Sequence, residues 1–208
     1  MAISSLKVFG ERHCGTNAIG YFAGQNFNLQ SQRHDFLGWK HRLAPHQLEW
    51  KKFAIENCLF IFCTRNPYSW LQAMHKEPYY DHYPKIKELS FQQFVQFSIE
   101  DYENLVAMWN QKNASYLRMA SEVPNSIIIP LEKFHDSQEK IHGDLQIILN
   151  KQNTPFIPMH DYVNGRGRHD DKDIEPSLAL PNLDQSIIEI IHASLSDEIM
   201  EKCNYQKL

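Results

Sequence analysis

A chain of 208 residues suits a single domain with one sizeable core, and 42% hydrophobic with 22% charged residues is ordinary for a globular protein. The formal net charge of −4 argues against a nucleic-acid coat or a polybasic membrane tail. No apolar run approaches the roughly 18 residues that a membrane span needs, and the first residues lack the apolar core of a secretory signal. We therefore expect one domain over residues 1–208, with no nucleic-acid partner, no membrane span and a cytoplasmic location.

The predicted elements alternate along the chain. Residues 3–9 form a short buried strand, followed by a polar turn and a helix over 18–27. A short amphipathic helix runs through Trp50 and Phe53. Residues 58–64 (CLFIFCT) are apolar throughout, as in a parallel strand that is covered on both faces. A long helix spans 99–120, a third buried strand spans 126–130 (SIIIP), and two more helices run through 141–148 and 187–199.

Strands that alternate with helices predict a three-layer α/β/α fold with a mainly parallel central sheet. Residues 153–181 contain four prolines and predict a long loop, a candidate lid. The cysteines, which are Cys14, Cys58, Cys63 and Cys203, lie far apart without a CxxC pair, which predicts free thiols.

The turn between the first strand and helix is the first candidate site. It reads GERHCGTN over positions 10–17, and its backbone N–H groups are expected to converge on an anion. Gly10 and Gly15 have Walker A spacing, but Thr-Asn follows, so the lysine of a nucleotide triphosphate loop is missing. Alone, the pattern fits an ordinary turn equally well. Replacing Gly15 by valine is expected to abolish anion binding while folding largely survives.

Two further segments carry candidate chemistry. Arg65 follows the central strand, where ligands of open α/β sheets bind, and Ser69 lies one turn later, so the pair can hold a phosphate. Lys40 and His41 place a cation beside a general base. Each segment alone has a simpler interpretation, a capped helix with a solvated arginine in the first case and a surface pair in the second.

The ordered combination of these motifs resembles the PAPS-dependent sulfotransferase superfamily, where PAPS is 3′-phosphoadenosine 5′-phosphosulfate. The likeness is closest to small bacterial-type members that open with G-E-R-x-[SC]-G-T-N. KVFGERHCGTNAI resembles the family's 5′-phosphosulfate loop, GWKH its acceptor-side motif, FCTRNPYSW its 3′-phosphate motif and SIIIPLEKF a later strand. The resemblance covers residues 7–134.

The resemblance implies a P-loop NTPase-like sulfotransferase fold and transfer of a sulfuryl group from PAPS to a hydroxyl or amine of a small molecule or glycan, leaving 3′-phosphoadenosine 5′-phosphate. It implies no metal, and it names neither the acceptor nor an oligomeric state. His41 is the expected base, opening into a cavity beside the loop, and Lys40, Arg12 and His13 are the other expected catalytic residues. The expected donor-binding residues are Gly10, Arg12, His13, Cys14, Gly15, Thr16, Asn17, Arg65, Ser69, Arg166 and Arg168.

Three positions depart from the family pattern. His13 stands where well-studied members have lysine, and Arg12 is the candidate to supply that cation. Ala73 stands where a phosphate-binding serine is usual, and Ser69 is its candidate substitute. Residues 165–168 only loosely resemble the C-terminal glycine-rich motif.

Other interpretations remain open at this stage. One is a P-loop kinase or other NTP-binding protein, and another is a non-catalytic nucleotide-binding module of the same fold. Cys14 is either a reactive thiol at a helix N-terminus or a small packing residue. Residues 169–173 (HDDKD) fit a metal site or, more simply, a solvated charged loop.

Overall fold

The computed structural model describes residues 2–78, 82–159 and 178–208. In this part of the chain, four parallel strands form one sheet in the order β2-β1-β3-β4. The strands are β1 (Ser5–Gly10), β2 (Gln30–Ser31), β3 (Cys58–Thr64) and β4 (Ser126–Pro130). The prediction of an α/β protein with a parallel sheet is therefore confirmed.

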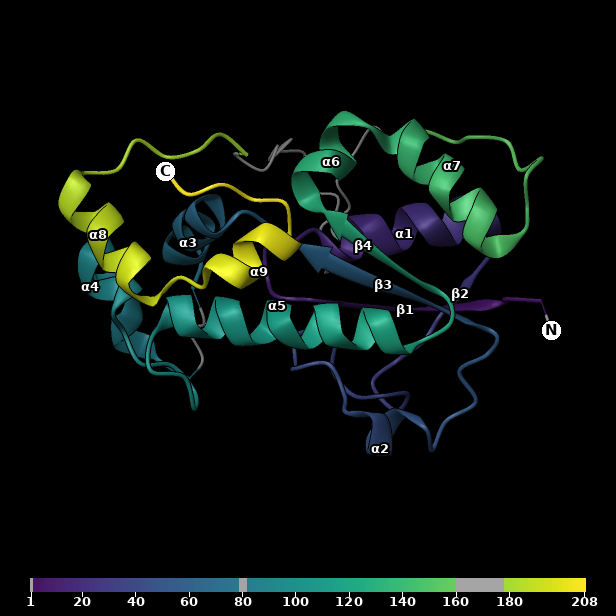
Figure 1. The fold of residues 1–208 in the computed structure, drawn as a ribbon, viewed down its shortest axis with the longest axis horizontal. Helices are drawn as coiled ribbons and strands as arrows, with labels where there is room; N and C mark the ends of the chain where they lie inside the picture. The colour runs from purple at the N-terminus through teal and green to yellow at the C-terminus, as the bar shows by residue number, and fades with distance from the viewer. Residues whose placement is uncertain (1, 79–81, 160–177) are drawn as a thin grey trace.

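Helices follow each strand and cover the sheet (Figure 1). They are α1 (Thr16–Phe27), α2 (Gln47–Trp50), α3 (Pro67–Lys76), the 3-10 helix η1 (Pro84–Glu88), α4 (Phe91–Val95), α5 (Leu105–Glu122), α6 (Leu131–Asp136), α7 (Gln138–Leu149), α8 (Gln185–Ser194) and α9 (Asp197–Lys202). Helices α3, α4 and α8 gather beyond the carboxyl ends of the strands, at left in Figure 1.

Alternate side chains of β1 and β3 enter two different hydrophobic cores. Leu6 and Ile61 pack into the core that contains α1 and α7, whereas Phe9 and Phe62 pack into a smaller core with Tyr116 of α5. The rings of Phe9 and Phe62 stack with centroids 5.9 Å apart. The apolar run at 58–64 is uninterrupted because helices lie on both faces of β3, so that every residue of the strand is buried.

The strand order reverses between β1 and β3. From β1 the chain crosses to β2 on one side, and from β3 it crosses to β4 on the other. In open parallel sheets the crevice at such a reversal, outside the carboxyl ends of the strands, is where ligands bind. The turns after Gly10 and Thr64 flank this reversal, so the topology brings the two predicted motifs to one place.

Several boundaries differ from the sequence prediction. The long helix begins at Leu105, because Ile99 and Tyr102 pair in an isolated antiparallel bridge and the Asn104 side chain caps α5 by accepting the Ala107 N–H at 2.8 Å. The last helix is two helices, since the chain bends at Leu195 and Ser196 caps α9. Phe53 lies beyond the end of α2.

Strand β4 was expected to be fully buried, but among its residues only Ile129 is buried. It pairs only with β3 within the described residues, so it is an edge strand with one side less covered.

The short β2, η1 and α4 have no periodic signal in the sequence and were missed. Of the predicted loop at 153–181, residues 153–159 and 178–181 contain no helix or strand, and the remainder, with Arg166, Arg168 and the HDDKD cluster, lies outside the described residues. None of the described helices combines the length and the apolar character needed to cross a bilayer.

Candidate functional site

The GERHCGTN segment forms a tight turn from β1 into α1. Gly10 lies so close to β3 that an added Cβ would be 2.7 Å from the Cys63 carbonyl oxygen. Gly15 caps α1 with a left-handed φ of 74°, and an added Cβ would be 2.6 Å from Cδ1 of Leu131. Gly10 is therefore required by its close approach to the backbone of β3, and Gly15 is favoured by its left-handed φ. The expectation that Gly15→Val leaves folding largely intact stays a prediction, and the left-handed φ of Gly15 argues against it, because a branched residue is strained there.

The backbone donors at the start of α1 have no acceptor within the described part of the chain. The Ile19 N–H donates to the Gly15 carbonyl at 2.9 Å, whereas the amides of Gly15, Thr16 and Asn17 have no acceptor among the described residues. The first amides of a helix need partners from outside the helix, and an anion satisfies them well. The geometry of this turn thus fits the predicted anion loop.

Lys40 and His41 lie directly against this loop. The Gly10 N–H donates to the Lys40 carbonyl at 3.0 Å, and the Lys40 ammonium donates to Oδ1 of Asn17. Nδ1 of His41 is 2.6 Å from the Gly10 carbonyl oxygen. Since a carbonyl only accepts, Nδ1 carries the proton and Nε2 has the free lone pair that a general base needs.

The environment of His41 makes it a neutral, weak base. Burial lowers its pKa to about 4, although Glu11 and the Gly10 carbonyl act in the opposite direction. Among the described residues, no hydrogen-bond partner of Nε2 of His41 is found, whereas Nδ1 is bonded to the Gly10 carbonyl.

The expected cavity beside His41 stays a prediction, although the side chain is only 9% exposed. A cavity of about 480 Å³ lies where α6 meets α7, and its lining includes none of the predicted site residues. The candidate site therefore consists of the Gly10–Asn17 loop and the imidazole of His41 beside it.

Arg65 and Ser69 lie beneath the loop. Arg65 is 3% exposed, and its guanidinium donates from Nη1 to the His13 carbonyl at 3.0 Å and from Nε to Oγ of Ser69 at 3.1 Å. Ser69 is fully buried and donates in turn to the Asn66 carbonyl at 3.2 Å. These contacts give Arg65 a position that supports the loop, and its expected contact with a 3′-phosphate stays a prediction.

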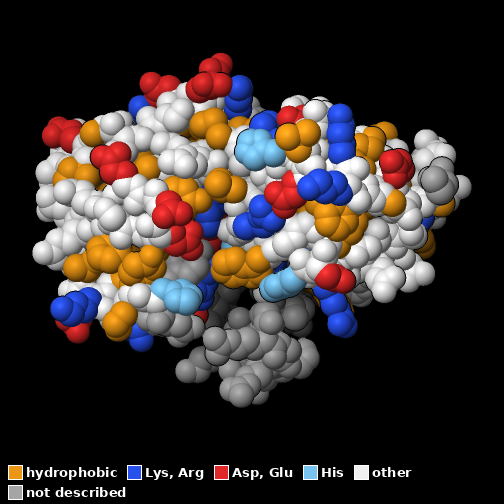
Figure 2. Space-filling view, turned by 90° about the horizontal axis from the view of Figure 1, so that it is seen from below, with side chains coloured by type: hydrophobic (Ala, Val, Ile, Leu, Met, Phe, Trp, Pro, Cys, Tyr) orange, Lys and Arg blue, Asp and Glu red, His pale blue; other side chains and the backbone are white. Residues whose placement is uncertain are grey.

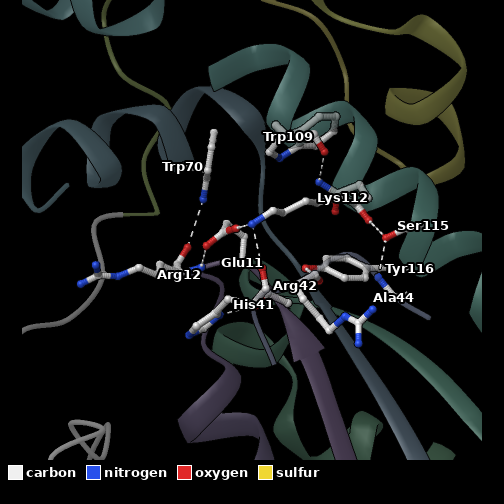
Figure 3. Close-up of polar contacts among 12 residues, drawn as sticks. Glu11, Arg12, His41, Arg42, Ala44, Trp70, Trp109, Lys112, Ser115 and Tyr116 are labelled. Atoms are coloured by element: carbon white, nitrogen blue, oxygen red, sulfur yellow. Dashed lines mark hydrogen bonds and ion pairs between the residues drawn. The ribbon is translucent and has the colours of Figure 1, made fainter. Parts of the chain in front are cut away.

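The other loop side chains point in different directions. Nε2 of His13 lies 3.0 Å from the Glu77 carbonyl at the end of α3, and burial lowers the pKa of His13. The Arg12 carbonyl accepts from Nε1 of Trp70 at 3.0 Å, while its side chain extends away from the polar cluster in Figure 3. Cys14 is buried, and burial raises its pKa well above the ordinary value, so the packing interpretation is favoured over a reactive thiol.

Sequence reasoning missed a buried ion pair beside the loop. Lys112 of α5 pairs with Glu11, and both side chains are at most 4% exposed. Lys112 also donates to the His41 carbonyl at 2.7 Å (Figure 3). The two residues are 101 positions apart, so no local pattern links them.

A second buried lysine, Lys7, donates to the carbonyls of Arg33 and Gly38 and so holds the segment that precedes Lys40.

No broad basic surface is visible on the face of the molecule nearest α2. In Figure 2, basic, acidic and histidine side chains there are interspersed with hydrophobic ones. Anion recognition on this side would therefore depend on a few placed groups.

Comparison with protein-family models, with curated proteins and with solved structures finds no match to this chain. Within residues 2–78, 82–159 and 178–208, no three His, Cys, Asp or Glu side chains gather as a metal-binding group.

Proposed function

We propose that this protein is a sulfotransferase of P-loop-like fold that moves a sulfuryl group from PAPS to an acceptor hydroxyl or amine. The observation that carries the proposal is the meeting of three features at the switch point of a parallel sheet. These are a loop whose first helix amides have no acceptor among the described residues, a lysine that reaches Asn17 of that loop, and a histidine whose Nδ1 is held by a backbone carbonyl while Nε2 keeps its lone pair. The motif order that resembles the sulfotransferase superfamily supports the same conclusion.

The proposed roles follow from these positions. The amides of Gly15, Thr16 and Asn17 would bind the phosphosulfate, with Lys40 and Arg12 balancing its charge. Nε2 of His41 would take the proton from the hydroxyl or amine of the acceptor substrate as its oxygen or nitrogen attacks sulfur. The bond from sulfur to the bridging phosphate oxygen then breaks, and 3′-phosphoadenosine 5′-phosphate leaves with the bonding electrons. Such loose, in-line transfers depend mainly on positioning and charge stabilisation.

Ligand-dependent thermal stability tests the donor assignment. We expect 3′-phosphoadenosine 5′-phosphate to stabilise the fold by about 2.7 kcal/mol at 100 times its dissociation constant, and ATP with magnesium to stabilise it much less. Equal stabilisation by ATP would favour the NTP-binding alternative. No stabilisation by either ligand would rule out the donor site.

One observation favours a second candidate, a nucleotide-binding module without catalysis. A histidine with a pKa of about 4 is a weak base, and the imidazole of His41 is almost buried. A single-turnover assay with labelled PAPS and a panel of phenol, sugar and amine acceptors separates the two. The enzyme transfers label, and His41→Ala slows transfer by roughly 10²–10⁴-fold while it leaves nucleotide affinity nearly intact. Tight nucleotide binding without transfer to any acceptor would favour the module.

A further inference from the structure

Helix α5 is the element that connects the segments of the site. Trp109, Lys112 and Tyr116 lie on its buried face, at spacings of three and four residues. Trp109 donates to the Arg65 carbonyl at 2.9 Å, and Tyr116 donates to the Arg42 carbonyl at 3.1 Å. One helix face thus contacts the turn after β3 and the segment that contains His41 (Figure 3).

Lys112, on the same face of α5, forms a buried ion pair, and burying two charges costs desolvation free energy. Its side chain is 3% exposed, and burying an ion pair often stabilises a protein no more than well-packed apolar residues would. Its ammonium donates to Oε2 of Glu11 and to the His41 carbonyl. Oε1 of Glu11 accepts the Arg12 N–H at 2.6 Å. The pair therefore links the main chain of Arg12 to the main chain of His41.

The pair also affects the charge of the anion loop. Glu11 brings a carboxylate into a turn that is proposed to bind an anion, and an unpaired carboxylate there would repel phosphate and sulfate. Lys112 compensates that charge from outside the loop. A lysine is thus present beside this Walker-like turn, although it comes from α5 rather than from the loop.

We propose that Glu11 and Lys112 are positioning residues of the site: their ion pair fixes His41 relative to the Gly10–Asn17 loop and cancels the carboxylate charge that would otherwise oppose donor binding. The inference rests on the proposed function for its turnover readout, and its structural part is measurable without turnover.

A mutant cycle separates charge compensation from positioning. The variants are Lys112→Met, Glu11→Gln and the double variant, with Lys202→Met as a matched control, because Lys202 pairs with Glu198 in an ion pair whose side chains are 56% and 71% exposed. Thermal unfolding, affinity for 3′-phosphoadenosine 5′-phosphate and single-turnover transfer are measured for each. Lys202→Met is expected to match the wild type in all three.

We expect Lys112→Met to unfold at lower temperature and to lose about tenfold or more in nucleotide affinity, because it removes the cation that balances the buried Glu11 carboxylate. The double variant should regain most of the lost unfolding temperature and bind the nucleotide within about threefold of wild-type affinity. It should nevertheless transfer the sulfuryl group at least about tenfold more slowly than the wild type. Wild-type turnover in the double variant, or unchanged affinity in Lys112→Met, would overturn the inference. If the double variant does not fold, Glu11→Gln, which keeps the side-chain volume, should show slower transfer with near wild-type affinity.

The Nδ1 proton of His41 gives a readout that is independent of catalysis. By NMR it should exchange slowly in the wild type, where it is bonded to the Gly10 carbonyl, and faster in the double variant. An unchanged exchange rate would refute the positioning role. If the wild-type protein neither binds the nucleotide nor transfers sulfuryl groups, the proposed function fails, and this proton alone decides whether the pair positions His41.

Discussion

The turns after β1 and β3 lie side by side at the carboxyl edge of the sheet. They differ in whether protein side chains accept hydrogen bonds from their backbone N–H groups. After β3, Oδ1 of Asn66 accepts the Tyr68 N–H at 3.0 Å, and Oε1 of Glu132 accepts the Asn66 N–H at 2.9 Å. After β1, no described side chain caps α1 and the first amides are left for another partner. The turn after β3 is closed by side chains of Asn66 and of Glu132 from α6, whereas the turn after β1 is open within the described residues.

The difference indicates that an arginine or a serine in a turn is not enough to define an anion site. Arg65 and Ser69 have the chemistry to bind phosphate, but each is buried and has protein partners. In the Gly10–Asn17 turn, no described side chain accepts the first amides of α1. Those backbone N–H groups therefore remain available to a ligand within the described residues. The following four predictions test this contrast.

The largest effect is expected at the open turn itself. Gly15→Val should lower the free energy of unfolding by about 3 kcal/mol or more, because the new side chain clashes with Leu131 and strains a left-handed residue. Urea denaturation measures this. Gly143→Ala is the control, since a Cβ there meets nothing within 4 Å and alanine in α7 should add about 0.5–1 kcal/mol. A well-folded Gly15→Val protein would contradict the tight packing of the turn.

Acid should destabilise the fold through His41, because burial beside the open turn disfavours its charged form. The pKa of His41 is lowered from 6.5 to about 4, so the unfolded chain binds the proton more readily between these values. The contribution of neutral His41 is complete above pH 6.5 and is lost as the pH falls toward 4, by up to roughly 3 kcal/mol.

The measurement is the difference in unfolding free energy between the wild type and His41→Asn across this pH range. Asparagine keeps an N–H donor toward Gly10 but does not titrate, so effects common to both proteins, including that of His13, cancel. A difference that stays constant from pH 7 to pH 4 would show that the pKa of His41 is not lowered.

Arg65→Ala tests whether the closed turn acts only by supporting the open one. We expect affinity to fall by about 1.5–3 kcal/mol for nucleotides with and without a 3′-phosphate alike, because the lost contact is the one to the His13 carbonyl. Calorimetry with the two nucleotides measures this. A loss confined to the 3′-phosphorylated nucleotide would instead establish Arg65 as the residue that binds that phosphate.

The smallest effect is expected at the cap of α3. Asn66→Ala removes the acceptor of the Tyr68 N–H and should cost about 1 kcal/mol of stability without changing nucleotide affinity. Asn104→Ala, which removes the equivalent cap of α5, is the matched control. If Asn66→Ala weakens nucleotide binding and Asn104→Ala does not, the turn after β3 contributes to the site directly.

Much of the fold could be predicted because it follows from local patterns. The apolar run at 58–64 indicates a buried parallel strand, and Gly10 and Gly15 mark the turn that starts α1. Helix ends were less predictable. The start of α5 depends on the Asn104 cap and on the bridge between Ile99 and Tyr102, and neither interrupts the helical spacing of apolar residues.

The sequence by itself determined the parallel α/β architecture and the closeness of the turns after Gly10 and Thr64, because strand ends in such a sheet share one edge. Only the tertiary structure decided which groups remain available there. Burial turned Arg65 and Ser69 inward, a backbone carbonyl set the tautomer of His41, and Lys112 reached Glu11 across 101 positions of chain. These outcomes depend on contacts between distant segments, and periodicity and spacing carry no information about such contacts.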